Sequence, residues 1–293
     1  MSTMDKTAGL ARITVAYIIA LFAGGASLHV FEFGTLLDIF LADLIATVVI
    51  FLFSRGYSNS SFYDAYWSVI PPFIALYWLA VGTGSSPPLR ELLVLGLILY
   101  WATRLTLNWA IHWEGMHHED WRYRLLRERA PNMALLTDFF GIHLFPTLQV
   151  FAGMLPVYAV YVLGERPLNW LDLLAAAVIA GAVTLQWVAD RQLHRFLATR
   201  QEGEQLQTGL WAWSRHPNYF GELGFWFGLF LFGLAAYPSG WYWEAIGFVL
   251  MLLMFLTASI PMMEKRSLER RPNYQQVIDS TSMLIPLPPT RNR

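Results

Sequence analysis

Cysteine is absent from the 293 residues of this chain, and charged residues are scarce, at 14% of the total. The lack of cysteine excludes disulfide bonds, thiolate catalysis, cysteine-ligated zinc and iron–sulfur clusters. The charged fraction is well below the roughly 25% of an ordinary soluble domain, which excludes most soluble folds. No basic stripe is present, so we expect no nucleic-acid partner.

Hydrophobic residues are abundant instead. They make up 56% of the chain and include 13 Trp, 20 Phe and 13 Tyr residues. A helix needs about 20 largely apolar residues to cross a bilayer, and windows of this kind lie at residues 10–31, 35–53, 62–81, 89–111, 139–163, 171–190, 219–237 and 241–263. The sequence therefore predicts an all-α fold, a polytopic membrane helical bundle of about eight transmembrane helices in a single domain over residues 1–293.

The Lys and Arg residues are distributed unevenly between the segments that join these windows. Arg90 and Arg166 fall on one side of the predicted bundle and Arg104 falls within a window, whereas the rest of the 20 lie on the side of both termini. Because positive charge is retained in the cytoplasm, we expect the termini and the polar segments 55–61, 112–138, 191–218 and 264–293 to be cytoplasmic. Any chemistry is then expected at the cytoplasmic face.

Ionisable residues inside spans are costly and are therefore candidates for functional sites. Those that stand out are Asp64, Arg104, Asp190 and Glu222. Arg104, Asn108 and His112 recur every four residues, which places them on one face of a helix. Arg104 has an alternative interpretation as half of a purely structural ion pair between helices. Asp43 is a lone carboxylate in an otherwise apolar span, and we interpret it as structural.

An acid and two phenols occur together in residues 62–67, where Asp64 is flanked by Tyr63 and Tyr66. A carboxyl group in an apolar site has a raised pKa and, together with a phenol, can offer protons to a substrate oxygen. The alternative is an aromatic belt at the lipid headgroups. Residues 112–124 are rich in His and acids, but neither an HExxH nor an HxxEH spacing is present, so we expect no metal.

The segment 186–222 combines arginines with tryptophans, Asn218 and Glu222. Arginine binds phosphates, aromatic rings stack on bases, and Asn with Glu can hold an amide, so the combination suits a nucleotide cofactor. Neither a GxGxxG nor a GxxxxGK[ST] motif is present, which excludes a Rossmann domain and a P-loop. An amphipathic helix at the membrane surface is the alternative.

Residues 215–222, Arg-His-Pro-Asn-Tyr-Phe-Gly-Glu, follow Gly209-Leu-Trp and precede Glu264-Lys-Arg-Ser-Leu and Ile285-Pro. Together they resemble the C-terminal signature of the steroid 5-alpha-reductase family, the 3-oxo-5-alpha-steroid 4-dehydrogenase type, and residues 63–67, 101–104 and 119–123 resemble its bacterial members. The resemblance implies a helical membrane enzyme that uses NADPH to reduce a carbon–carbon double bond conjugated to a ketone, as in 3-oxo-4-ene steroids. It also implies a seven-span core, to which residues 10–31 add an N-terminal helix.

The same resemblance implies roles for regions and residues. It divides the chain into N-terminal helices (1–61), substrate-side helices with a cytoplasmic loop (62–138), and cofactor-binding helices with the C-terminal tail (139–293). Gln186 and Asp190 match positions that touch the adenosine half of the cofactor, and Asn218 and Glu222 match those that hold the nicotinamide carboxamide. The full set of expected cofactor-binding residues is Arg104, Asn108, Gln186, Asp190, Arg195, Arg200, Trp211, Arg215, His216, Asn218, Tyr219, Glu222, Lys265 and Arg266.

Asp64 is the candidate proton donor to the ketone, with Tyr66 or Tyr100 as its partner. We expect a monomer in a bacterial inner membrane that takes a small hydrophobic substrate, a steroid or other enone, from the lipid. Two alternatives stay open. The Arg-His-Pro-x-Tyr-x-Gly core also resembles isoprenylcysteine carboxyl methyltransferases, which bind S-adenosylmethionine, and a non-enzymatic sterol-binding membrane protein has the same composition.

Overall fold

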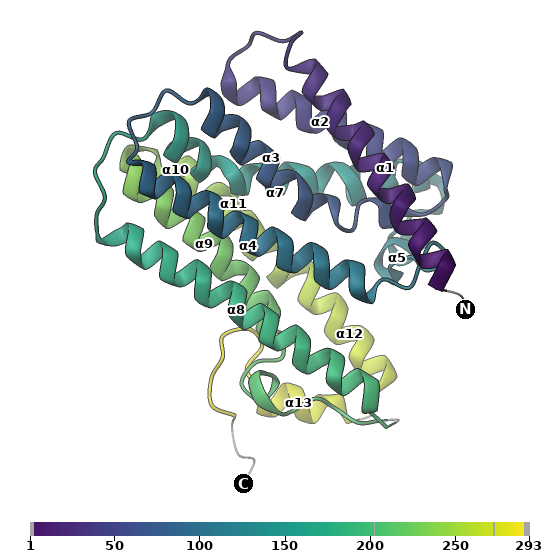
Figure 1. Ribbon diagram of the computed structural model, residues 1–293. Coiled ribbons are helices and arrows are strands. Elements are labelled where there is room, and N and C mark those ends of the chain that lie inside the picture. The colour runs from purple at the N-terminus through teal and green to yellow at the C-terminus, as the bar shows by residue number, and fades with distance from the viewer. Residues whose placement is uncertain (1–2, 202, 272, 290–293) are drawn as a thin grey trace.

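The computed structural model describes residues 3–201, 203–271 and 273–289, and every regular element in these ranges is helical. The α-helices are α1 (Thr3–Ser27), α2 (Thr35–Gly56), α3 (Tyr66–Val81), α4 (Pro88–His112), α5 (Trp121–Arg129), α6 (Ala134–Leu136), α7 (Phe145–Tyr158), α8 (Trp170–Thr199), α9 (Pro217–Ala236), α10 (Trp241–Glu244), α11 (Ile246–Met254), α12 (Ile260–Arg270) and α13 (Tyr274–Ser280). They form one bundle (Figure 1), which confirms the all-α, polytopic fold class.

Among the described residues, seven helical segments are long and apolar enough to cross a membrane, not the eight that the windows predict. They are Asp5–Ser27, Thr35–Gly56, Pro88–His112, Pro131–Leu163, Trp170–Thr199, Pro217–Ala236 and Pro238–Arg270. The exception is α3, which has 16 residues and is therefore about 24 Å long, short of the roughly 30 Å of a hydrocarbon core. The predicted span at residues 62–81 starts four residues before the α-helix does, at Tyr66.

The late start of α3 has a cause in the residues before it. Asn59 donates to the carbonyl oxygens of Met116 and His118, at 2.7 and 3.1 Å. The backbone N–H of Ser60 donates to Glu119 at 2.7 Å. Because these groups are bound to a distant loop, residues 60–62 form a 3₁₀ turn and the α-helix begins only at Tyr66.

The two ends of the bundle are held by different polar contacts. At one end the fully buried guanidinium of Arg90 binds both carboxylate oxygens of Asp172, at 2.6 and 2.8 Å, and the carbonyl oxygen of Arg166 at 2.7 Å. At the other end Arg127 binds Glu119 and Asp138, and Lys6 near the start of α1 donates to the carbonyl oxygen of Ile111. The two ends correspond to the two sides that the distribution of Lys and Arg predicts.

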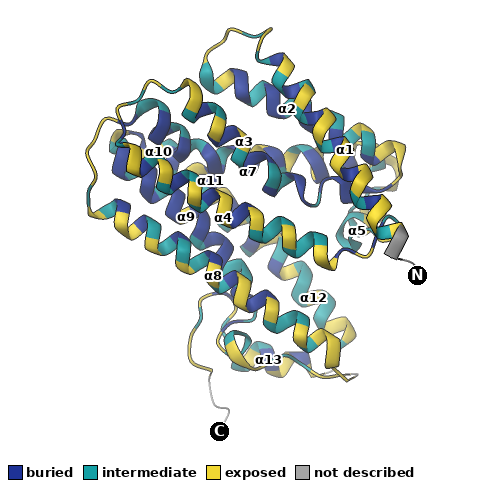
Figure 2. Cartoon of the chain, in the orientation of Figure 1, coloured by how far each residue is buried: buried dark blue, intermediate teal, exposed yellow. Residues whose placement is uncertain are grey.

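Helix α9 occupies the centre of the bundle and packs most extensively against α8. Small residues permit this close approach: a Cβ atom on Gly221 would lie 2.8 Å from the carbonyl oxygen of Ala182, and one on Gly228 would lie 2.3 Å from Ile179. Figure 2 shows α9 largely buried, while the outer helices α1 and α8 carry exposed residues along their length. Many of those exposed residues are large and apolar, such as Phe22 and Leu173, as a lipid-facing surface requires.

Candidate functional site

A polar cluster lies between α4, α8 and α9, and its members are Arg104, Gln186, Asp190, Asn218 and Glu222. Arg104 of α4 donates to the side chains of Gln186 and Asp190, which lie one turn apart on α8. Its Nε atom is buried and has no hydrogen-bond partner. The guanidinium is thus fixed by α8 while one donor stays available.

Glu222 connects all three helices. Its carboxylate accepts hydrogen bonds from Gln186 at 3.1 Å, from the indole of Trp226 at 2.9 Å and from the indole of Trp101 at 3.1 Å. The Trp101 ring stacks on Phe225 at a centroid distance of 4.3 Å, so aromatic rings enclose the carboxylate. A buried charge with this many donors is stabilised in place.

Asn218 lies in the first turn of α9, directly after Pro217, which begins the helix. Its amide nitrogen donates to Asp190 at 3.4 Å, a long contact at the limit of a hydrogen bond. Asn218 is half-buried, whereas Asp190 is buried. The Asn218 side-chain oxygen accepts from the backbone N–H of Tyr219 at 3.0 Å, so it is the amide nitrogen, with its long contact, that is best placed to exchange its partner for a ligand.

Asp64 and Tyr123 form an acid–phenol pair at the same end of α4. The Tyr123 hydroxyl donates to Asp64 at 2.7 Å, and the indole of Trp109 makes a longer contact of 3.3 Å with the same carboxylate. Burial raises the pKa of the Asp64 carboxyl above its ordinary value, although the hydrogen bond from Tyr123 opposes that effect. Burial also raises the pKa of Tyr123, and the Asp64 charge adds to the effect. Burial thus shifts the pKa of both groups in the same direction, upward.

The phenol of Tyr219 interacts with charges from both sites, the acid–phenol pair and the polar cluster. The charges of Arg122 and Asp120, next to Tyr123 in sequence, act on its phenol, and so does the charge of Asp190 in the cluster. Burial would lower the pKa of Arg122, but its 2.7 Å ion pair with Asp120 outweighs burial and raises that pKa. The charges around Tyr219 are thus fixed before any ligand binds.

Two predicted cofactor residues, Arg215 and His216, contact α12 or the C-terminal tail. Arg215 donates to Glu264 at 2.6 Å and to the carbonyl oxygens of Ile278 and Thr281. His216 contacts the same Glu264 oxygen at 3.3 Å. These contacts fix the segment 278–281 and Glu264 against the base of α9.

The remaining predicted cofactor residues surround the cluster without joining it. Trp211 donates to the carbonyl oxygen of Ala189 at 2.9 Å, Tyr219 stacks between His216 and Phe255, Asn108 is half-buried on α4, and Arg195, Arg200 and Lys265 are exposed. Arg266 lies 3.8 Å from the centre of the Trp121 ring.

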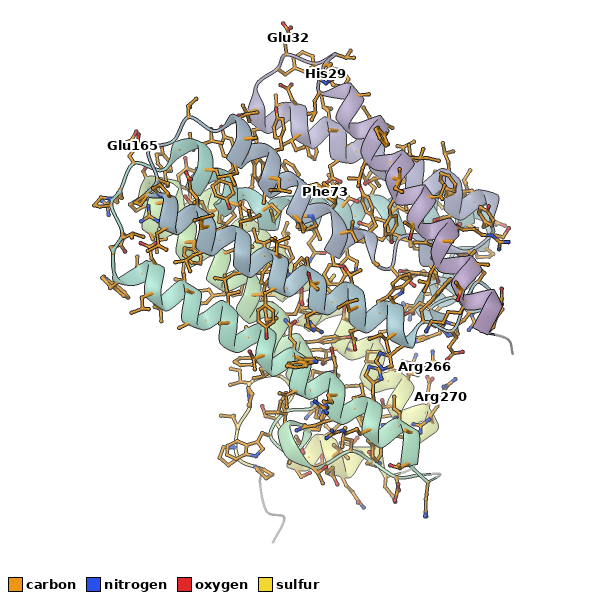
Figure 3. All side chains as sticks on the ribbon, in the orientation of Figure 1. His29, Glu32, Phe73, Glu165, Arg266 and Arg270 are labelled. Carbon is orange, nitrogen blue, oxygen red and sulfur yellow. The ribbon has the colours of Figure 1, made fainter. Side chains whose placement is uncertain are left out.

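A cavity of about 350 Å³ lies between α5 and α12. The charged residues that line it are Arg124, Arg129, Lys265, Arg266 and Arg270, with Glu128 and Glu269. Figure 3 labels Arg266 and Arg270 on this side of the molecule.

The structure does not bring either expected phenol to Asp64. Tyr66 is buried and donates to Asp43 at 2.9 Å. Tyr100 is 38% exposed on the outer face of α4, where its hydroxyl contacts Thr184 at 3.2 Å. Tyr123 takes the expected place, and the only sequence signal for it is the resemblance of residues 119–123 to bacterial reductases.

This arrangement can orient a polar amide-bearing group against fixed donors and acceptors, and it can present a phenol and a carboxyl group to an oxygen atom. Within the described ranges, no group of three or more His, Asp or Glu side chains is placed to hold a metal ion. His117, one of the adjacent histidines, lies 3.4 Å from Asp5.

The model of a family described as "Protein of unknown function (DUF1295)" matches residues 50–281. An uncharacterized protein of Schizosaccharomyces pombe is 26% identical to this chain over 281 residues, which cover 87% of this chain and 79% of the yeast protein. No solved structure matches.

Proposed function

We propose that this chain, which belongs to the DUF1295 family of multi-span membrane proteins, is an NADPH-dependent reductase of the conjugated carbon–carbon double bond of a hydrophobic enone, such as a 3-oxo-4-ene steroid. Steroid-reductase-like proteins are among the members of this family. The observation that carries the proposal is the convergence of the polar cluster on three helices, next to an acid–phenol pair, inside a membrane bundle.

The residues of the polar cluster fit a nicotinamide cofactor. The free Nε donor of Arg104 and the weakly held amide of Asn218 provide complementary groups for a carboxamide. The exposed Arg195 and Arg200 at the end of α8 offer cations for phosphates. NADPH would be held by these residues, with Glu222 fixing their positions through Gln186 and the two indoles.

When bound, NADPH would supply the hydride that the β-carbon of the enone accepts. The chain itself acts at the carbonyl oxygen, where negative charge develops. When Asp64 is protonated it donates to the Tyr123 oxygen, which frees the Tyr123 hydroxyl to donate a hydrogen bond to the substrate oxygen and stabilise the enolate. A proton from water, delivered to the α-carbon, completes the saturated ketone. The buried surroundings of Asp64 strengthen these interactions because water competes poorly there.

The test is NADPH binding and turnover by the full-length protein in nanodiscs, comparing wild type with Asn218→Ala. Losing a hydrogen bond to a buried polar group costs about 1–3 kcal/mol, which is roughly 5- to 150-fold in affinity. Asn132→Ala is the matched control, because Asn132 is exposed and far from the cluster in the fold. Glu222→Ala is less informative because it also removes the contacts of Trp101 and Trp226.

Three results would contradict the proposal. Equal NADPH affinity in wild type and Asn218→Ala would show that the cofactor does not bind at Asn218. Tight binding of S-adenosylmethionine would favour a methyltransferase. Binding of a steroid without any nucleotide binding would favour a non-enzymatic sterol-binding protein.

A further inference from the structure

A second site is formed by a cavity of about 670 Å³ between α1, α2 and α3, on the side of the molecule away from α8 and α9. Its volume is in the range of pockets for small molecules, roughly 300–1,000 Å³. Figure 3 labels two lining residues, Phe73 in the body of the bundle and His29 at the end of α1. No residue of the polar cluster lines this cavity.

Small residues create this space. The walls contributed by α1 and α2 include Gly24, Gly25, Ala26, Ala42 and Ala46. A Cβ atom on Gly25 would meet no atom within 4 Å, so the missing side chain leaves a volume that no neighbour fills. A larger side chain at Gly25 would therefore project into open space without displacing the backbone.

The carboxylate at the wall of this apolar cavity is Asp43, which is 2% exposed. One of its oxygens accepts the hydrogen bond from Tyr66, and the other, Oδ2, is buried without any partner. The Tyr66 ring that holds the first oxygen is itself packed against Tyr17, at a centroid distance of 6.0 Å. A buried polar atom without a partner is costly, so the site favours a ligand that supplies a donor.

We propose that this cavity binds an apolar membrane molecule with a single hydroxyl group, whose O–H donates to Oδ2 of Asp43 while its hydrocarbon body lies against α1, α2 and α3. A ketone or an ether has no O–H to donate to Oδ2. The site is separate from the polar cluster and does not rest on the reductase function.

The experiment uses the full-length protein in nanodiscs without NADPH, labelled with a long-chain primary alcohol that carries a diazirine in its chain. Unlabelled 1-dodecanol and dodecyl methyl ether are the competitors. Labelling is expected on peptides of α1, α2 and α3, and the alcohol is expected to compete about tenfold better than the ether, because only the alcohol donates a hydrogen bond. In Asp43→Leu this preference should disappear.

A second test fills the cavity with a larger side chain. Gly25→Leu should abolish the labelling, whereas Gly181→Leu, also a helical glycine with nothing within 4 Å, should leave it unchanged. Equal competition by alcohol and ether, labelling spread over all lipid-facing helices, or unchanged labelling of Gly25→Leu would overturn the proposal. If the variants fail to fold, the comparison of the two competitors on the wild-type protein decides.

Discussion

Tyr123 donates a 2.7 Å hydrogen bond to Asp64, although 59 residues separate them in the chain. We expect Tyr123→Phe to lower kcat for an enone by about 10²-fold or more, because removing one donor from a preorganised oxyanion site typically costs about 10²–10³. NADPH affinity should change little. Tyr100→Phe is the control, since Tyr100 is on the outer face of α4, and its kcat should match wild type within about twofold. Equal losses in the two variants would contradict the role of Tyr123.

Asp64 gives a prediction about pH. Because burial raises its pKa, the protonated, active form persists above the ordinary carboxyl range, and kcat should fall as pH rises through the raised pKa. Any stability that the neutral carboxyl contributes is lost over the same window, since its pKa is higher in the folded state. A pH–rate profile of wild type and Asp64→Asn checks this. The same alkaline limb in both would assign the titration to another group.

The choice of cofactor depends on the end of α8. Arg195 and Arg200 are exposed there, and we expect the double variant Arg195→Ala/Arg200→Ala to lose about 3- to 10-fold in kcat/KM with NADPH and little with NADH, because exposed charge pairs contribute modestly. Arg12→Ala, an exposed arginine of α1, serves as control. Wild type with equal kcat/KM for both cofactors would refute a 2′-phosphate site.

The ion pair between Arg90 and Asp172, at the end of the bundle opposite Arg127, gives a prediction about the stability of the protein. Replacing fully buried Arg90 by Leu leaves Asp172 as an uncompensated buried charge, which costs about 3–5 kcal/mol. We expect a large drop in thermal midpoint, which the double variant Arg90→Leu/Asp172→Leu partly restores. Arg166→Ala should have little effect, because only the backbone carbonyl of Arg166 takes part. An unchanged midpoint in Arg90→Leu would show that the pair contributes nothing.

Low pH should weaken the contacts of Glu119 with Ser60 and Arg127, which hold α5 in place. Burial alone would raise the pKa of Glu119, but Arg127 and the backbone of Ser60 outweigh it and lower that pKa. The stabilisation is therefore present above the ordinary pKa of the carboxyl and is lost as pH falls through the lowered one. Hydrogen exchange of residues 121–129 should accelerate over that acidic range in wild type. Glu119→Gln should show faster exchange already at neutral pH.

The all-α class could be predicted from the sequence, because an apolar run of membrane length must satisfy its backbone hydrogen bonds internally and a helix does so. It also marked Arg104, Asp190 and Glu222 as costly ionisable residues within spans, and the structure brings these three into one polar cluster. It failed where the outcome depends on distant partners. Residues 59–61 start no helix because they bind the 116–119 loop, and the same contacts bring Tyr123 of α5 to Asp64.

The ion pair between Arg104 and Asp190 also constrains how the protein is made. Asp190 leaves the ribosome 86 residues after Arg104, an interval of roughly 4–17 s at about 5–20 residues per second. During that time α4 carries an arginine without its carboxylate, at a cost of about 2.5–3.5 kcal/mol on insertion scales. Pairing with Asp190 removes that cost, so the order of synthesis delays the full stabilisation of α4 until α8 has been made.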